Sequence, residues 1–231
     1  MLWLEAVNGL GNITEPTTKS NTSVNRIDCE SCQLGKLNKK HIYSSRRIRS
    51  STPGENLHVD ICGPLGTSTI GNGKYFALFK DECTNYRFLF VMKSREEVFD
   101  RMRQVFAEIE AETGNRVRHL YSDCGTEFTS IRSQNFLIQK GALHKTSIPF
   151  NPAQNEFIER DNRTVVEGIR SLKHMNVDEK LWGEAACTFV YLLNRSCNSN
   201  TGPRTPFELF HKRKPEVSQL RIFGCLAFVK T

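Results

Sequence analysis

Long apolar runs are missing from this 231-residue sequence. No stretch approaches the roughly 18 consecutive apolar residues of a membrane-spanning helix. The apolar start, MLWLEAV, is short, contains Glu5 and has no basic lead-in, which excludes the pattern of a secretory signal peptide. With a mean hydropathy of −0.45, the chain has the composition of an ordinary soluble protein and the length of one large domain with extensions.

Closely spaced cysteines are also scarce. Of eight cysteines, only Cys29 and Cys32 lie near each other. Without a signal peptide, this pattern favours reduced intracellular thiols over a disulfide framework.

Acidic residues are absent from residues 31–54, where the sequence is basic. The whole chain carries a formal charge of +7 and has a sequence pI near 9.0. This balance suits a polyanionic partner, nucleic acid first, although charge alone fits a merely cationic soluble protein equally well. The one-sign run indicates a solvated arm that can bind nucleic acid, formed by Lys36, Lys39, Lys40, Arg46, Arg47 and Arg49.

Residue periodicity predicts an α/β chain. We expect strands over residues 56–61, 74–80, 86–92, 115–122, 143–148 and 220–230, and helices over 95–114, 133–140, 155–172, 178–195 and, briefly, 205–210. Three sequential antiparallel strands followed by alternating helices and strands indicate a mixed sheet flanked by helices.

Three acids occupy notable places in this order. Asp60 lies inside the first strand, Asp123 follows the fourth strand, and Glu159 lies in the helix after the fifth. Singly, each has an ordinary structural explanation: a turn cap, an Asx turn, or an acid favoured by the helix dipole. Together they are better explained as a site, because ligands bind at the carboxyl ends of strands in open α/β sheets.

The motifs around these acids resemble a known family. HVDICGPL resembles its first-aspartate strand, YSDCGTEF resembles S-D-N-G-G-E-[FY], and PFNPAQNEFIERDNRT resembles P-x-[TN]-P-x-Q-N-G-x-x-E-R-x-N-R-T. LLNRS, TPFELF and LRIFGCLAFV resemble the segments that follow its core. The chain is similar to the integrase of copia-type LTR retrotransposons, within the retroviral-integrase family of DDE polynucleotidyl transferases. The family's triad has 35 residues between its second and third acids, as Asp123 and Glu159 do.

The resemblance implies a ribonuclease-H-like core with five strands and a metal-dependent integrase with endonuclease activity. Asp60, Asp123 and Glu159 would be catalytic and would bind two Mg²⁺ or Mn²⁺ ions, which serve the attacking and leaving oxygens of phosphoryl transfer. It also implies element-end and target DNA as partners, a homo-oligomer, and location in the nucleus. Rivals are a ribonuclease H, a cut-and-paste transposase, and a decayed or domesticated integrase that only binds nucleic acid.

Residues around Glu159 are expected to touch DNA. Asn155 or Asn151 would cap the helix, and Asn162 and Arg163 lie one turn after Glu159 on the same face. The alternative for Arg163 is an intrahelical ion pair with Glu159. The predicted DNA-binding set is Asn155, Asn162, Arg163, Lys36, Lys39, Lys40, Arg46 and Arg47.

Departures from the family pattern concern three positions. Cys124 replaces the usual Asn, and Thr126 and Glu156 replace glycines, which puts full activity in doubt. Glu156 also removes a flexible glycine before the catalytic helix and adds a negative charge beside DNA.

The amino-terminal segment matches only part of the family's zinc site. Cys29 and Cys32 are present, but no histidine precedes His41, and two cysteines cannot complete a four-ligand zinc site. We therefore expect a fragment of a Pol polyprotein, with Zn²⁺ bound only if the full-length protein supplies a His pair. The expected divisions are 1–50 as a zinc-domain remnant and basic linker, 51–200 as the catalytic core, and 201–231 as the start of a C-terminal extension.

Overall fold

A five-stranded mixed sheet forms the centre of the molecule. The computed structural model describes residues 50–146, 156–173 and 177–225. The strands are β1 (Asn56–Cys62), β2 (Tyr75–Asp81), β3 (Arg87–Met92), β4 (His119–Ser122) and β5 (Leu143–Thr146). Their order is β3-β2-β1-β4-β5. The first three are antiparallel, whereas β4 pairs parallel with both β1 and β5, so the predicted mixed sheet is confirmed.

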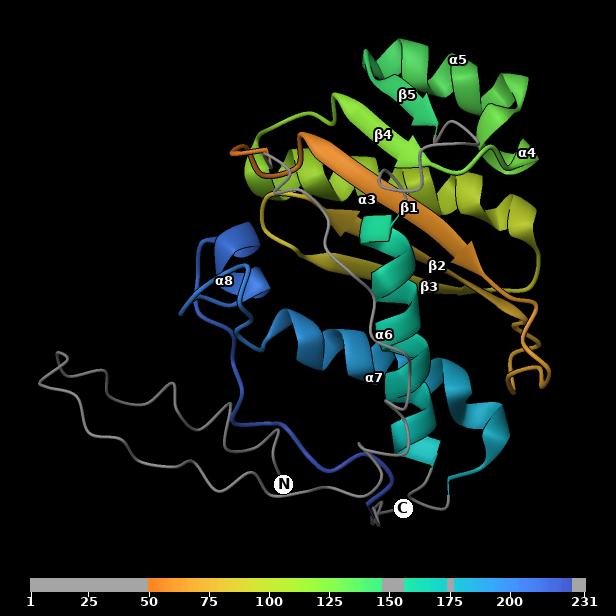
Figure 1. Cartoon of the computed structure of the whole chain (residues 1–231), viewed down its shortest axis with the longest axis vertical. Helices are drawn as coiled ribbons and strands as arrows, with labels where there is room; N and C mark the ends of the chain where they lie inside the picture. The colour runs from red at the N-terminus through yellow and green to blue at the C-terminus, as the bar shows by residue number, and fades with distance from the viewer. Residues whose placement is uncertain (1–49, 147–155, 174–176, 226–231) are drawn as a thin grey trace, which may run out of the picture.

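Helices cover both faces of this sheet (Figure 1). On one face lies α3 (Val98–Thr113), which follows the short η1 (Arg95–Glu97). On the other face lie α6 (Glu156–Lys173) and α7 (Trp182–Asn194), the latter preceded by η3 (Glu179–Leu181). Two short helices, α4 (Thr126–Thr129) and α5 (Ile131–Lys140), connect β4 to β5. The sequence did not predict α4.

The sheet side chains alternate between two cores. On the α3 face, Leu57, Val59 and Phe79 pack with the buried stripe of α3. On the other face, Phe76 and Leu78 pack with α6 and α7. This alternation follows from the two-residue period of a strand and places Asp60, which is paired with Leu78, on the α6 side.

Close packing between α6 and α7 depends on a glycine. A Cβ atom at Gly168 would lie 2.4 Å from the ring of Phe189. On the sheet-facing side of α6, Ile158, Val165 and Ile169 are buried as the apolar spacing predicts, whereas the side chain of Leu172 lies outside the described residues.

The last helix, α8 (Pro206–His211), packs back onto the sheet. Thr205 and Glu208 form a capping box at its start. The ring of Phe210 is fully buried and stacks on Tyr86 with 4.5 Å between centroids. Residues after position 200, assigned from the sequence to an extension, therefore contribute to the core that contains α3.

Two predicted strands differ from the structure. β4 begins only at His119, because the N–H groups of Arg118 and His119 both donate to the Glu55 carbonyl just before β1. The part of the predicted 220–230 strand that is described, up to Cys225, is a turn. Gly224 has a φ of 79°, and the Cys225 N–H donates to the Ile222 carbonyl. None of the helices in the described ranges has both the length and the apolar character needed to cross a membrane.

Candidate active site

Asp60 projects from β1 toward α6 and is held by two hydrogen bonds. Its Oδ1 accepts from the Ile61 N–H at 2.8 Å. Its Oδ2 accepts from the Asn162 side-chain amide at 2.8 Å. Asn162, which is predicted to touch DNA, is 8% exposed and donates to the Asp60 carboxylate. Its role in DNA binding stays a prediction.

Asp123 follows β4 directly, as predicted, and the turn around it is fixed. The Gly125 N–H donates to Asp123 Oδ1 at 3.1 Å. The Ser122 hydroxyl donates to the Asp123 carbonyl at 2.7 Å and lies 2.7 Å from His144 Nε2. With the hydroxyl proton used in this way, the Ser122 oxygen can accept a hydrogen bond from His144 Nε2 in the tautomer that carries a proton there. Burial lowers the pKa of His144, and Asp123 opposes that shift.

An arginine lies on the other side of this turn. Arg95 donates to Glu127 Oε1 from Nη2 at 2.6 Å and from Nε at 2.9 Å, and the Glu127 side chain is 6% exposed. These hydrogen bonds, together with the nearby charge of Asp123, raise the pKa of Arg95. The contact ties α4, which begins three residues after Asp123, to η1 just before α3.

Glu159 is exposed on the first turn of α6, in the predicted position on the helix after β5. The pKa of Asp60 is raised to about 6, chiefly by burial and also by the charges of Asp123 and Glu159, whereas the hydrogen bonds from Ile61 and Asn162 lower it. The structure thus brings the three acids into one electrostatic environment. The charges of Asp123 and Glu159 both act on Asp60, although burial is the larger cause of its raised pKa.

The three acids do not close into a metal cage. Among the residues that the structure describes, no three His, Cys, Asp or Glu side chains form a group that could hold a metal ion. The donor set nevertheless fits a hard divalent cation in type and charge. It consists of carboxylates, and the charges of Asp123 and Glu159 add to the burial that raises the pKa of Asp60.

Arg163 is exposed one turn after Glu159. Both side chains are described, and no ion pair joins them, so the alternative explanation of Arg163 as an intrahelical partner is not observed. The remaining predicted ligands and DNA-binding residues lie outside the described part of the chain: Cys29, Cys32, Lys36, Lys39, Lys40, Arg46, Arg47, Asn151 and Asn155. The side chain of Glu156 is also outside it.

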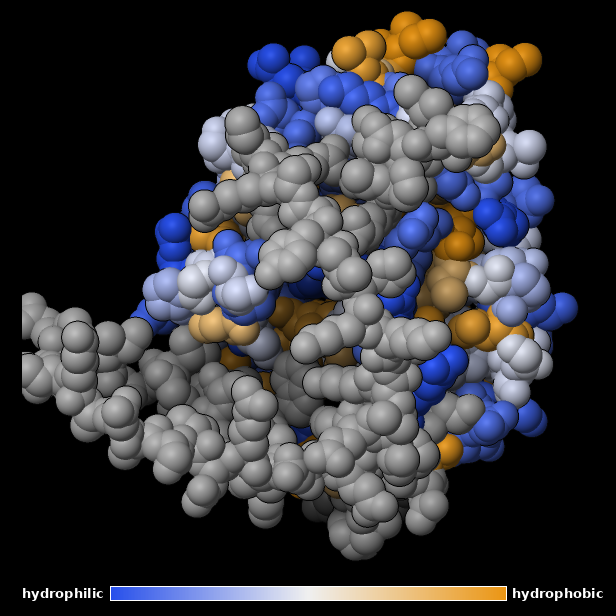
Figure 2. Space-filling model, in the orientation of Figure 1, coloured by the Kyte–Doolittle hydropathy of each residue, from blue (hydrophilic) through white to orange (hydrophobic). Residues whose placement is uncertain are grey.

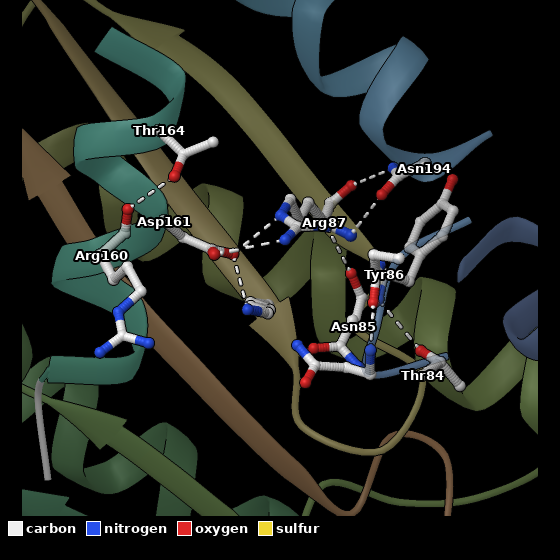
Figure 3. A network of polar contacts seen from close by, with 11 residues as sticks. Thr84, Asn85, Tyr86, Arg87, Arg160, Asp161, Thr164 and Asn194 are labelled. Atoms are coloured by element: carbon white, nitrogen blue, oxygen red, sulfur yellow. Dashed lines mark hydrogen bonds and ion pairs between the residues drawn. The ribbon is translucent and has the colours of Figure 1, made fainter. Parts of the chain in front are cut away.

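Sequence reasoning missed a buried ion cluster on the same side of the sheet (Figure 3). Asp161 of α6 accepts from Arg87 Nε at 2.7 Å and from Nη2 at 3.2 Å, and it lies 2.9 Å from Lys80 Nζ. All three side chains are at most 9% exposed. Asn194 at the end of α7 exchanges two hydrogen bonds with the Arg87 backbone, at 2.9 and 2.7 Å.

The sequence did contain a signal for this cluster. Lys80 and Arg87 flank the turn of the predicted hairpin and are direct partners in the β2–β3 register. Like charges opposite each other in neighbouring strands are unfavourable. An acid must therefore reach them from the covering helix, and Asp161 supplies it.

The surface around the site is uneven. A hollow of about 680 Å³ lies between α3 and α5 and is lined by residues such as Arg103, Phe136 and Gln139, not by the three acids. Figure 2 shows apolar side chains gathered over α5 at one end of the molecule. The exposed apolar residues of that region include Ile131, Ile138 and Leu143.

Comparisons with known proteins agree with this architecture. Residues 50–152 match the integrase core domain family. The chain is 32% identical over 201 residues to the retrovirus-related Pol polyprotein from transposon TNT 1-94 of Nicotiana tabacum, covering 87% of this chain and 15% of that protein. It is 32% identical over 210 residues to the corresponding polyprotein from transposon RE2 of Arabidopsis thaliana, covering 90% of this chain and 14% of that protein. The chain therefore spans a small fraction of the length of these relatives.

A solved structure supports the fold. A chain in the cryoEM structure of the simian T-cell lymphotropic virus intasome, in complex with PP2A regulatory subunit B56 gamma, superposes with a TM-score of 0.58 at 16% identity. The match covers 88% of this chain and 69% of that chain. The ribonuclease-H-like fold predicted from the sequence is thereby confirmed.

Proposed function

We propose, from the integrase core domain that residues 50–152 match and from the similarity to retrotransposon Pol polyproteins, that this chain is the catalytic part of a DNA integrase. One observation carries the proposal. Asp60, Asp123 and Glu159 come from β1, the end of β4 and α6, and their charges meet at Asp60, whose pKa is raised to about 6.

The chain's own residues would prepare these carboxylates for metal. Asn162 and the Ile61 N–H orient the two Asp60 oxygens, while the Gly125 N–H fixes Asp123. Glu159 stays exposed and able to approach a bound substrate. Two Mg²⁺ or Mn²⁺ ions, when bound, would supply activation of the attacking oxygen and stabilise charge on the leaving oxygen. Asp60 must lose its proton to serve, so activity should fall as the pH drops below about 6.

The reaction would proceed on DNA in two stages. Water first attacks the phosphodiester near the element's end, and the freed 3′-hydroxyl then attacks a phosphodiester of the target strand. Each stage breaks one P–O bond and forms another, and neither needs a covalent protein intermediate. Arg163, exposed one turn after Glu159, would contact a phosphate of the bound strand.

Partners and location follow from the same proposal. Element ends and target DNA would be the substrates, and a homo-oligomer would hold two ends together. The similar intasome chain supports assembly on DNA. The reaction would take place in the nucleus, and Zn²⁺ would bind Cys29 and Cys32 only if the full-length protein completes the site.

A metal-dependent strand-transfer assay tests the proposal. The chain would be incubated with a labelled duplex that has a recessed 3′-hydroxyl end, a plasmid acceptor, and Mg²⁺ or Mn²⁺. We expect joined product from the native chain and none from Asp123→Asn or Glu159→Gln. Glu184→Gln, which removes an equal charge from an exposed site on α7, should retain activity.

A different result would favour the second candidate, a nucleic-acid-binding module without catalysis. If the chain binds the duplex but never joins it with either metal, the catalytic proposal fails. If joining occurs and persists in Glu159→Gln, the assignment of the third acid is wrong.

A further inference from the structure

A second concentration of positive charge lies at the end of the described chain. Residues 195–214 contain five basic residues and a single acid. That acid, Glu208, is engaged locally, because its Oε2 accepts from the Thr205 N–H at 2.8 Å and from the Thr205 hydroxyl at 3.0 Å. More than half of the chain's formal charge of +7 is therefore carried by these few residues: Arg195, Arg204, Lys212, Arg213 and Lys214.

The basic residues around the end of α8 are held in place by buried neighbours. α8 is anchored by Phe210, which is fully buried, and ends where Lys212 adopts a left-handed conformation with a φ of 56°. Pro215 is buried in turn. Lys212, Arg213 and Lys214 stand exposed between these two buried residues, so they are held at the surface in a defined place.

Aromatic rings organise two of the cations. The Arg195 guanidinium lies 3.4 Å from the ring centroid of Tyr191 and 4.6 Å from that of Phe207. Arg213 lies 5.5 Å from the same Phe207 ring. Tyr191 itself is 42% exposed. Interleaved arginines and aromatic rings of this kind are typical of surfaces that bind nucleic acid.

The positive charge is not neutralised within the described chain. Burial lowers the pKa of Arg195, and nearby Arg213 adds to that shift. The Nε of Arg195 is buried without a hydrogen-bond partner among the described residues. Cations elsewhere behave differently: Arg116 and Lys140 pair with Glu110 at 3.3 and 3.2 Å, and Arg132 pairs with Asp100 at 3.3 Å.

We propose that the α7–α8 basic surface, formed by Arg195, Arg204, Lys212, Arg213 and Lys214, binds the phosphate backbone of duplex DNA. Exposed cations attract an anion, and several cations on neighbouring segments suit a repeating polyanion better than a single ion. The inference rests on the proposed function only for the identity of the polyanion as DNA. Because α8 packs near Tyr86, at the turn joining β2 to β3, this surface is separate from the three acids.

Two triple variants with equal net charge form the test. Lys212→Gln/Arg213→Gln/Lys214→Gln removes three unpaired cations. The matched control, Arg116→Gln/Arg132→Gln/Lys140→Gln, removes three paired ones. Binding to a short blunt duplex would be followed by fluorescence anisotropy in EDTA, between about 50 and about 200 mM salt. Thermal melting would verify that both variants fold.

We expect the first variant to lose about tenfold or more in affinity at the lower salt concentration. Its salt dependence should fall by about one power of salt concentration for each lost phosphate contact. The control should stay near the native chain. Equal losses of DNA affinity in the two variants, or no loss in either, would overturn the proposal. The same binding measurement on polyglutamate and on anionic vesicles identifies the polyanion. If the first variant lost binding to either of these but not to DNA, the proposal would also be overturned.

The outcome is separable from that of the proposed function. This assay contains no divalent metal and measures no joining of strands. A chain that binds DNA through the α7–α8 basic surface but never joins ends would defeat the integrase proposal alone.

Discussion

Two aspartates on the same side of the sheet have opposite electrostatic settings. Asp161 is 7% exposed, and burial alone would raise its pKa, but Arg87 and Lys80 reverse that effect and hold the pKa below its usual range. No cation in the described part of the chain is among the main influences on the pKa of Asp60. Burial, Asp123 and Glu159 raise its pKa to about 6 against two hydrogen bonds.

The difference separates a carboxylate that serves the fold from one that we propose to be functional. Asp161 fastens α6 to β2 and β3 through two ion pairs and therefore serves the fold. Asp60 is left with uncompensated charge, which costs stability and leaves room for a cation. Because Asp161 and Asn162 are adjacent on α6, the structural ion cluster also positions the helix whose amide holds Asp60.

The largest expected effect on stability comes from removing the charge of Asp161, which pairs with Lys80 and Arg87. Asp161→Asn keeps the shape of the side chain but removes the buried anion that Lys80 and Arg87 share. Removing one member of a buried pair costs about 3–5 kcal/mol. Urea unfolding at neutral pH should therefore show a large fall in the free energy of unfolding.

A hydrophobic replacement provides the control for this prediction. Asp161→Leu combined with Lys80→Met and Arg87→Met removes all three charges together, which is often neutral or stabilising. If Asp161→Asn leaves stability unchanged, the ion cluster contributes nothing to the fold. Asp161 would then not differ from Asp60 in serving the fold.

The second-largest effect is expected from Asp60→Asn, which should stabilise the protein at neutral pH instead of destabilising it. The folded pKa of about 6 lies above the ordinary value of 3.8, so the folded state binds the proton more tightly. Wild-type stability is then lost as the pH rises from about 4 through about 6. Asn cannot ionise, so we expect the variant to be more stable by about 1–3 kcal/mol at about pH 7.5 and equal to wild type at about pH 4. Thermal unfolding at both pH values would show whether the advantage disappears in acid.

The placement of the acids was predictable, whereas their surroundings were not. Asp60 and Asp123 sit at places that strand periodicity and turn residues define locally, and Glu159 follows from the helix after β5. The contacts of Asp161 join residues 74 positions or more apart and require the β2–β3 register and the rotation of α6 together. The burial of Asn162 against Asp60 depends on the same rotation, which a single helix sequence does not specify.

A smaller effect is expected from Asn162→Ala. The substitution removes one donor to a partly buried carboxylate, which costs about 1 kcal/mol when Asp60 is ionised. The loss should shrink below the pKa of Asp60, where the carboxyl is neutral. The pKa of Asp60, followed by NMR, should move further upward. A downward movement would show that Asn162 does not stabilise the ionised form.

The smallest effect on stability is expected from Glu159→Gln. Glu159 is exposed, and its charge is the least of the influences on the pKa of Asp60. Exposed substitutions of this kind usually change stability by less than about 0.5 kcal/mol.

The effect of Glu159→Gln on metal binding should be distinct from its effect on stability, because a ligand that binds only the folded state raises the melting temperature. We expect Mg²⁺ or Mn²⁺ to raise the melting temperature of the native chain and to do so less in Glu159→Gln, with Glu184→Gln as the matched control. An equal metal-induced rise in all three proteins would remove Glu159 from the site, since the carboxylate would then contribute neither to folding nor to metal binding.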